Sequence, residues 1–246
     1  MEKLLQQQKS LRLVVVAKNA NPPYVTKIMD RFYFKGDCSD KLFITSGGVS
    51  HLHYLPRQHH AIENLSIHWI FYADMSTLIT AWTIYLTKLT LTNVPSKGME
   101  KTWKTIDSLP FLKSLNLCSM YGVAIPNDFT ALERLEEFSL SGYNASLVPV
   151  LSKLGSSLKH LSLDFVCLNE MDLYNVMGNN AKFGENIVHF TLGEIMVPIN
   201  PEQNFGFNSV SSAKYKEFFG LFSTKMANLN RLDLNCAADV SQSPSI

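Results

Sequence analysis

The chain has little charge and almost no imbalance of sign. Its 246 residues include 22 Lys and Arg and 21 Asp and Glu, so the formal net charge is +1 and only 17% of residues are charged. No long basic run is present to neutralise a row of phosphates, which disfavours nucleic acid as a partner. The hydrophobic fraction of 46% also disfavours disorder over most of the length.

Cysteine is scarce, and no secretory signal sequence is visible. The first residues, MEKLLQQQKS, place glutamines where a signal peptide needs an apolar run. The four cysteines have no CxxC or zinc-type spacing, so we expect reduced thiols in a cytoplasmic or nuclear protein. They are Cys38, Cys118, Cys167 and Cys236.

Motifs that carry catalysis are missing. The sequence contains no GxSxG, no HExxH and no phosphate-binding loop, and Gly47-Gly48 indicates only a short turn. Cys118 has only Thr92 and Ser141 at matching positions of neighbouring motifs, and neither can act as a base. We therefore expect a non-enzymatic protein without a cofactor.

Only one apolar stretch approaches the length of a membrane span. It runs over 69–86 as WIFYADMSTLITAWTIYL and is interrupted by Asp74 and several hydroxyl side chains. Asp74 can instead cap a helix that places Leu78, Ile79 and Trp82 on one face. We favour this amphipathic helix and expect no membrane partner.

A six-residue motif with apolar residues at positions one, four and six recurs along the chain. Its starting positions 62, 86, 112, 135, 158, 187 and 229 differ by 24, 26, 23, 23, 29 and 42 residues. The first five intervals fall in the window of about 20–29 residues that is typical of leucine-rich repeats. The copies are IENLSI, LTKLTL, LKSLNL, LEEFSL, LKHLSL, IVHFTL and LNRLDL, with a looser copy, MDRFYF, at 29–34.

Each motif predicts a short strand, because side chains alternate between the two faces of a strand. Positions four and six then point inward, and positions three and five point outward. The residue that follows the motif, numbered seven, also points outward. Helices are predicted over 127–134, 146–155 and 213–222, the second ending at Gly155. Stacking such units predicts an α/β leucine-rich-repeat solenoid, a curved horseshoe with parallel strands on the concave face and helices on the convex face.

The expected domain organisation has three parts. Residues 1–28 form an N-terminal cap or irregular segment, and residues 29–238 form the leucine-rich-repeat array. A proline- and asparagine-rich insertion near 197–212 accounts for the 42-residue interval. Residues 239–246 are expected to be a disordered tail.

Two segments resemble a known family. LPFLKSLNLCSM at 109–120 and LGSSLKHLSLDF at 154–165 resemble the leucine-rich repeats of F-box proteins and of the wider ribonuclease-inhibitor-like superfamily. The resemblance covers about residues 62–235. Position nine, where the family often has Asn or Cys, holds other residues here, and no F-box is found.

The resemblance implies a protein-protein interaction module. Its concave face would bind a protein substrate, and its wider partners would include cullin-type ubiquitin-ligase components. A free-standing inhibitor or assembly factor is the alternative, because unrelated functions share such repeats. A histidine-dependent metalloenzyme is the third and least favoured hypothesis.

The outward positions give the candidate partner-binding residues. Small polar groups dominate position five, which lets a partner approach closely. The larger polar side chains are the candidates for contacts: Lys88, Asn116, Glu137, His160, Asp164, His189, Arg231 and Asp233.

Histidines form two groups with open interpretations. Adjacent strands should place Glu137, His160 and His189 in one file, with Asp164 near His160. This file could be a pH-sensitive contact or a zinc site, but a solvated polar surface is the favoured interpretation. The second group, at 51–60, is assigned to a loop or helix surface, so no metal site is predicted.

Overall fold

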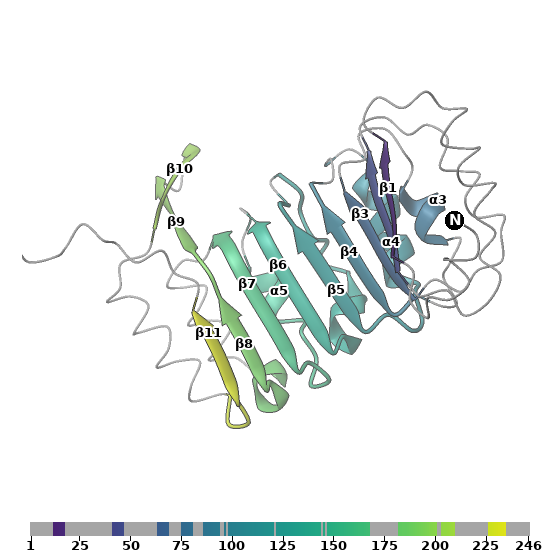
Figure 1. Cartoon of the computed structure of the whole chain (residues 1–246). Coiled ribbons are helices and arrows are strands. Elements are labelled where there is room, and N and C mark those ends of the chain that lie inside the picture. The colour runs from purple at the N-terminus through teal and green to yellow at the C-terminus, as the bar shows by residue number, and fades with distance from the viewer. Residues whose placement is uncertain are drawn as a thin grey trace, which may run out of the picture.

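The computed structural model describes the chain in segments. These are residues 12–17, 41–46, 63–68, 75–80, 86–93, 96, 98–120, 122–143, 145, 147–167, 182–200, 203–209 and 226–234. Within these segments eleven strands form a single sheet (Figure 1).

Nine of the strands lie side by side in sequence order, and each is parallel to its neighbours. A parallel sheet needs a crossover after every strand, which agrees with the long intervals between motifs. The strands are β1 (Arg12–Ala17), β2 (Lys41–Ser46), β3 (Asn64–His68), β4 (Lys88–Thr92), β5 (Ser114–Cys118), β6 (Glu137–Tyr143), β7 (His160–Cys167), β8 (His189–Leu192) and β11 (Arg231–Leu234).

The register keeps equal motif positions opposite one another from β3 onward. Residues at position four form one row, and residues at position six form a second row two residues further along each strand. A slip of one residue would turn both apolar rows toward the other face. The rows are Leu65, Leu89, Leu115, Phe138, Leu161, Phe190 and Leu232, and Ile67, Leu91, Leu117, Leu140, Leu163, Leu192 and Leu234.

The first two strands were not predicted. β1 falls within 1–28, which the sequence assigned to a cap or irregular segment, and it pairs with β2 like any other strand of the sheet. β2 places Leu42 and Ile44 opposite Leu65 and Ile67 of β3. It therefore carries only the second half of the motif, whereas the looser copy at 29–34 lies outside the described residues.

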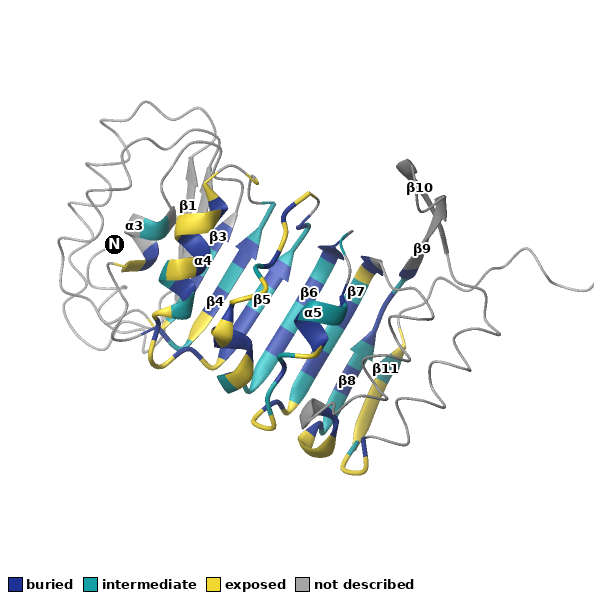
Figure 2. Ribbon diagram, turned by 180° about the vertical axis from the view of Figure 1, so that it is seen from behind, coloured by how far each residue is buried: buried dark blue, intermediate teal, exposed yellow. Residues whose placement is uncertain are grey.

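Helices lie on one side of the sheet. They are α3 (Met75–Thr80), α4 (Met99–Asp107), α5 (Val148–Leu151) and the 3-10 helices η2 (Thr130–Arg134) and η3 (Lys182–Asn186). In Figure 2 the α-helices stand in front of the sheet, and in Figure 1, viewed from the opposite side, they stand behind it. The expected α/β class with a parallel sheet is thus confirmed, although regular helix is sparse.

The predicted helices are shorter than expected. Only the last part of 127–134 is helical, as the 3-10 helix η2, and the segment 146–155 contains the four-residue helix α5. Pro149 has no backbone N–H to donate and so occupies the first turn of α5. The helix predicted at 213–222 lies outside the described residues.

The longest described helix, α4, was missed. It buries Met99, Thr102, Trp103 and Ile106, which stand at the i, i+3, i+4 and i+7 spacing of an amphipathic helix. This pattern was readable in the sequence. It occurs once and contains no leucine, unlike the recurring strand motif, and it is preceded by Gly98 in the left-handed conformation.

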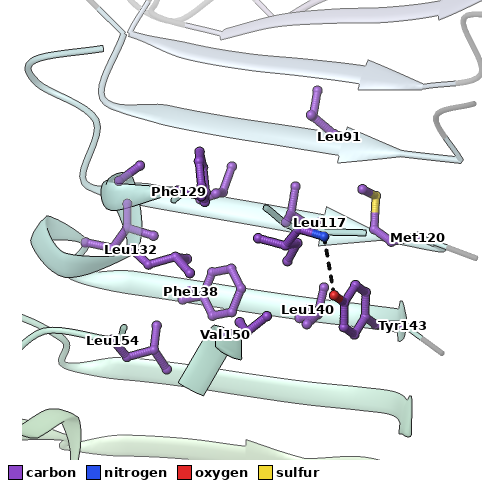
Figure 3. Packing of buried hydrophobic residues seen from close by; sticks show 14 of the residues in the cluster. Leu91, Leu117, Met120, Phe129, Leu132, Phe138, Leu140, Tyr143, Val150 and Leu154 are labelled. Carbon is purple, nitrogen blue, oxygen red and sulfur yellow. Dashed lines mark hydrogen bonds between the residues drawn. The ribbon is translucent and has the colours of Figure 1, made fainter. Parts of the chain in front are cut away.

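The core lies between the sheet and the helices and loops that cover one of its sides (Figure 3). The two apolar rows pack there against side chains such as Phe129, which meets Trp103 edge-on with ring centroids 5.1 Å apart. Two polar groups at the core are hydrogen-bonded: Trp103 Nε1 donates to the Ala124 carbonyl at 3.1 Å, and the Ile125 N–H donates to Tyr143 Oη at 3.3 Å. Full burial of one such apolar side chain contributes about 1.5–3 kcal/mol.

Two charged side chains connect α4 to η2. The carboxylate of Asp107 accepts hydrogen bonds from the Ala131 N–H at 2.6 Å and from the Thr130 hydroxyl at 3.0 Å. In return, Arg134 donates to the carbonyls of Asp107 at 2.7 Å and Leu109 at 3.0 Å. Backbone groups that helix ends leave unpaired are thereby satisfied by the neighbouring segment.

The insertion predicted near 197–212 is a hairpin where a loop was expected. β9 (Ile195–Asn200) and β10 (Gln203–Ser209) pair antiparallel, and β9 also pairs with the end of β7 through Val166 and Ile195. Figure 1 shows the hairpin projecting beyond the edge of the sheet. Proline and asparagine were taken as loop signals, but the strand pairing overrides them.

The last strand, β11, buries its motif residues poorly. Leu232 is 42% exposed and Leu234 is 50% exposed, whereas the matching residues of β3 to β8 are buried. Among the described strands β11 pairs with β8 alone, so in that part of the chain its leucines have a neighbouring strand on one side.

No helix within the described segments is long and apolar enough to cross a membrane. The stretch at 69–86 contains α3, of six residues, whose Ile79 is fully buried in the core.

Gly155 makes a testable contact between neighbouring motifs. A Cβ atom at this position would overlap the backbone carbonyl of Glu133, which cannot move independently of η2. We expect Gly155→Ala to lower the free energy of unfolding by about 1–3 kcal/mol, measured by urea denaturation. The adjacent, exposed Ser156→Ala is the control and should stay within about 0.5 kcal/mol of wild type. Equal stability of the two variants would contradict the close approach.

Candidate protein-binding surface

The side of the sheet opposite the helices carries the outward motif positions of β3 to β8 and β11. We call this surface the polar face; its members occupy positions three, five and seven. The position-three row is Asn64, Lys88, Ser114, Glu137, His160, His189 and Arg231, and the position-five row is Ser66, Thr90, Asn116, Ser139, Ser162, Thr191 and Asp233. The predicted file of Glu137, His160 and His189 is therefore present on β6, β7 and β8.

An ion pair spans three strands, β4 to β6, toward the β3 end of the position-three row. Lys88 Nζ on β4 lies 3.0 Å from Glu137 Oε2 on β6, and the intervening Ser114 hydroxyl donates to the same oxygen at 2.8 Å. The pair covers Ser114, which is only 8% exposed despite its outward position. Partial burial raises the pKa of Glu137, but the hydrogen bonds from Lys88 and Ser114 outweigh it and hold that pKa below its usual value.

A second charged cluster lies at the other end of the row. Asp233 on β11 accepts from Arg231 through two nitrogens, at 3.0 and 2.9 Å, and its Oδ2 lies 2.8 Å from His189 Nε2. The hydrogen bond from Arg231, and after it that from His189, lowers the pKa of Asp233. The carboxylate therefore stays ionised at neutral pH.

Between these clusters the polar groups are unpaired. His160 meets the His189 ring edge-on at 5.7 Å between centroids. Among the described residues no hydrogen bond joins the side chains of His160, Ser139 or Ser162 to another group. These three residues line a depression of about 260 Å³ that extends from Lys88 to Thr191. The centre of the polar face thus has hydrogen-bonding capacity that the fold does not use.

Asp164, one of the predicted contact residues, also makes contacts within the fold. Its Oδ1 accepts the Glu194 N–H at 3.0 Å, and the carboxylate packs where a Cβ on Gly193 would stand. Asp164 therefore fixes the turn that follows β8. Of the other candidates, Asn116 accepts a hydrogen bond from the Cys118 thiol at 3.1 Å.

The thiol of Cys118 is protonated at neutral pH. Burial raises its pKa most, hydrogen bonds with Thr92 and Asn116 oppose the rise, and the charge of Asp164 adds to it. A protonated, half-buried thiol is a poor nucleophile.

Within the described segments, no three His, Cys, Asp or Glu side chains are grouped so that they could hold a metal ion. Asp164, which the zinc hypothesis placed beside His160, is held by the backbone of Glu194. The histidines at 51–60 lie outside the described residues.

Position eight, the second residue after the six-residue motif, has a backbone conformation that the sequence did not predict. Four successive strands place a residue with positive φ there: Asn93 at 52°, Ser119 at 55°, Gly142 at 64° and Phe165 at 47°. Gly takes this left-handed conformation freely and Asn tolerates it, but for most residues it costs about 1–2 kcal/mol. A phenylalanine at this position is therefore unusual.

Searches against protein-family models, curated proteins and solved structures found no match to this chain. These comparisons therefore assign the chain to no family.

The Lys88, Ser114 and Glu137 contact predicts a pH dependence. A carboxyl group whose pKa is lowered on folding stabilises the protein above its unfolded value of about 4.5, and this contribution is lost as the pH falls through the lower, folded pKa. Because the pair is half-exposed, we expect Glu137→Gln to cost about 0.5 kcal/mol at neutral pH. The cost should shrink steadily on acidification in urea titrations.

Glu100→Gln is the matched control, since the Glu100 ion pair with Lys104 is 3.0 Å long but largely solvent-exposed on α4. It should cost less at neutral pH than Glu137→Gln. A cost for Glu137→Gln that does not change between neutral and acidic pH would show that the charge of Glu137 is not responsible.

Proposed function

We propose that this protein is a non-enzymatic leucine-rich-repeat solenoid whose polar face binds another protein. The parallel strands in sequence order, their constant register and the helices on one side support the solenoid. In this architecture the strand face is concave and the helical face convex. The resemblance to the repeats of F-box proteins points in the same direction.

The unused hydrogen-bonding capacity at the centre of the polar face carries the proposal. His160, Ser139 and Ser162 lie in a depression, while the charged groups on both sides are already paired with one another. Serine is small, so a partner backbone can come close to β6 and β7. Preformed flanking ion pairs lose little freedom when a partner binds, which lowers the entropic cost of association.

Two roles are consistent with such a surface. The substrate-receptor role in a cullin-type ubiquitin ligase follows from the resemblance to F-box proteins, and a free-standing inhibitor or assembly factor is the alternative. The two differ in whether ligase subunits accompany the bound protein. His160, together with the paired groups Lys88, Glu137, His189, Arg231 and Asp233, is proposed to contact or orient the partner.

Larger uncharged side chains in the depression test whether the polar face binds the partner. We expect Ser139→Gln with Ser162→Gln to weaken binding of a partner at least tenfold, because the longer side chains fill the space that the partner occupies. Both positions are partly exposed, so the thermal midpoint should stay within about 2 °C. The partner is first captured from cells with the wild-type chain, and its affinity is then measured with purified proteins.

The control is Ser108→Gln with Ser152→Gln, two exposed serines that follow α4 and α5 on the helical side. This variant should bind like wild type. Equal loss in both double variants, or no loss in either, would place the partner elsewhere. Cullin-ligase subunits in the capture would favour the substrate-receptor role, and a stable partner without them would favour the inhibitor or assembly role.

A further inference from the structure

Phe165 is held in a strained backbone conformation by contacts that do not involve its ring. On one side, Asp164 Oδ1 accepts the Glu194 N–H at 3.0 Å; on the other, the Val166 N–H donates to the Glu194 carbonyl at 3.3 Å. Val166 then pairs with Ile195 as β7 continues alongside β9. The bend at position eight is therefore required by the fold, but a phenylalanine is not.

Glycine would satisfy the same bend with less strain, as Gly142 does on the adjacent strand β6. Phe165 is 41% exposed, so burial in the core recovers only part of this cost. Strained residues that the fold does not need are concentrated at functional sites. Strain and exposure together make Phe165 a candidate for a role outside the fold.

The polar face lacks the element that protein interfaces usually depend on. Its described members include no Phe, Tyr or Trp, and its charged groups are mostly paired with one another. Binding energy in interfaces is concentrated in a few desolvated side chains, among which aromatic residues are enriched. Phe165 lies one residue beyond position seven of β7 and thus borders the polar face.

The charged residues near the C-terminal ends of the strands indicate which side chains the partner presents. Positions seven and eight of β4 to β8 hold only two charged residues, Asp164 and Glu194, and both are carboxylates. Both are engaged within the fold, yet their negative potential remains at the edge. A partner surface with Lys or Arg around an apolar pocket complements it.

We propose that Phe165 is the aromatic anchor of the binding surface and inserts into an apolar pocket, bordered by Lys or Arg, on the protein that the polar face binds. The inference rests on the proposed function, because it takes that protein as the partner. It adds the residue that supplies affinity, whereas the polar face supplies specificity.

Site-specific photo-crosslinking tests the Phe165 anchor and the polar face separately. The photoreactive amino acid p-benzoylphenylalanine replaces Phe165, Ser162 or Phe111 of the full chain in cells. Phe111 is the matched control. It is 56% exposed and precedes β5, and so lies near the N-terminal ends of the parallel strands, whereas Phe165 lies near their C-terminal ends. We expect positions 165 and 162 to crosslink to the same protein, and position 111 not to do so.

The crosslinked protein is then purified and its affinity measured. Phe165→Gly should weaken binding at least 30-fold and leave the thermal midpoint unchanged or higher, because glycine relieves the strain at position eight. Phe165→Leu, which retains apolar bulk, should weaken binding less than tenfold, and Phe111→Gly should bind within twofold of wild type. Binding should also weaken as the ionic strength rises.

The outcomes separate the inference from the proposed function. A crosslink from 162 without one from 165, or an unchanged affinity of Phe165→Gly, overturns the anchor and leaves the polar face in place. A crosslink from 165 alone keeps the anchor and removes the polar face. A lower thermal midpoint of Phe165→Gly would show that the ring serves the fold, and crosslinks from neither position would overturn both proposals.

Discussion

The structure depends on the burial of two apolar residues per strand, at positions four and six of the motif, in the same register from β3 to β8. Alternation along a strand sends both residues to one side, and the parallel register aligns them with their equivalents on the next strand. The rows run from Leu65 and Ile67 on β3 to Leu192 on β8 and are buried throughout. Among the described residues the helices cover this side, so the same constraint that builds the core directs the polar motif positions to the opposite side of the sheet.

The parallel sheet and the polar face could be predicted from sequence because one short motif determines both. A period of two fixes which residues face outward, and it correctly placed Glu137, His160 and His189 in one file. The helical side was predicted poorly, since its segments are short and their conformation is set by packing. Asp107 and Arg134, for example, act through hydrogen bonds to backbone groups that no local pattern reveals.

The details of the candidate site escaped prediction for a related reason. Ser114 gave no signal that it would lie beneath the Lys88 and Glu137 pair, and the hydrogen bond that Asp164 accepts from the backbone of Glu194 was not predicted. Both outcomes depend on which groups face each other across strands, together with the backbone bend at position eight. Motif periodicity predicts direction, but it does not predict which polar groups are already paired.

The hairpin of β9 and β10 shows how such a chain can acquire new surface. It lies in the longest interval, between β8 and β11, yet those two strands pair in the same register as every other pair. Closing a longer loop costs little, about 0.6 kcal/mol for each doubling of its length. Inserted segments can therefore vary between related chains without disturbing the buried rows. The hairpin thus adds two strands to the sheet at little cost to the packing of its core.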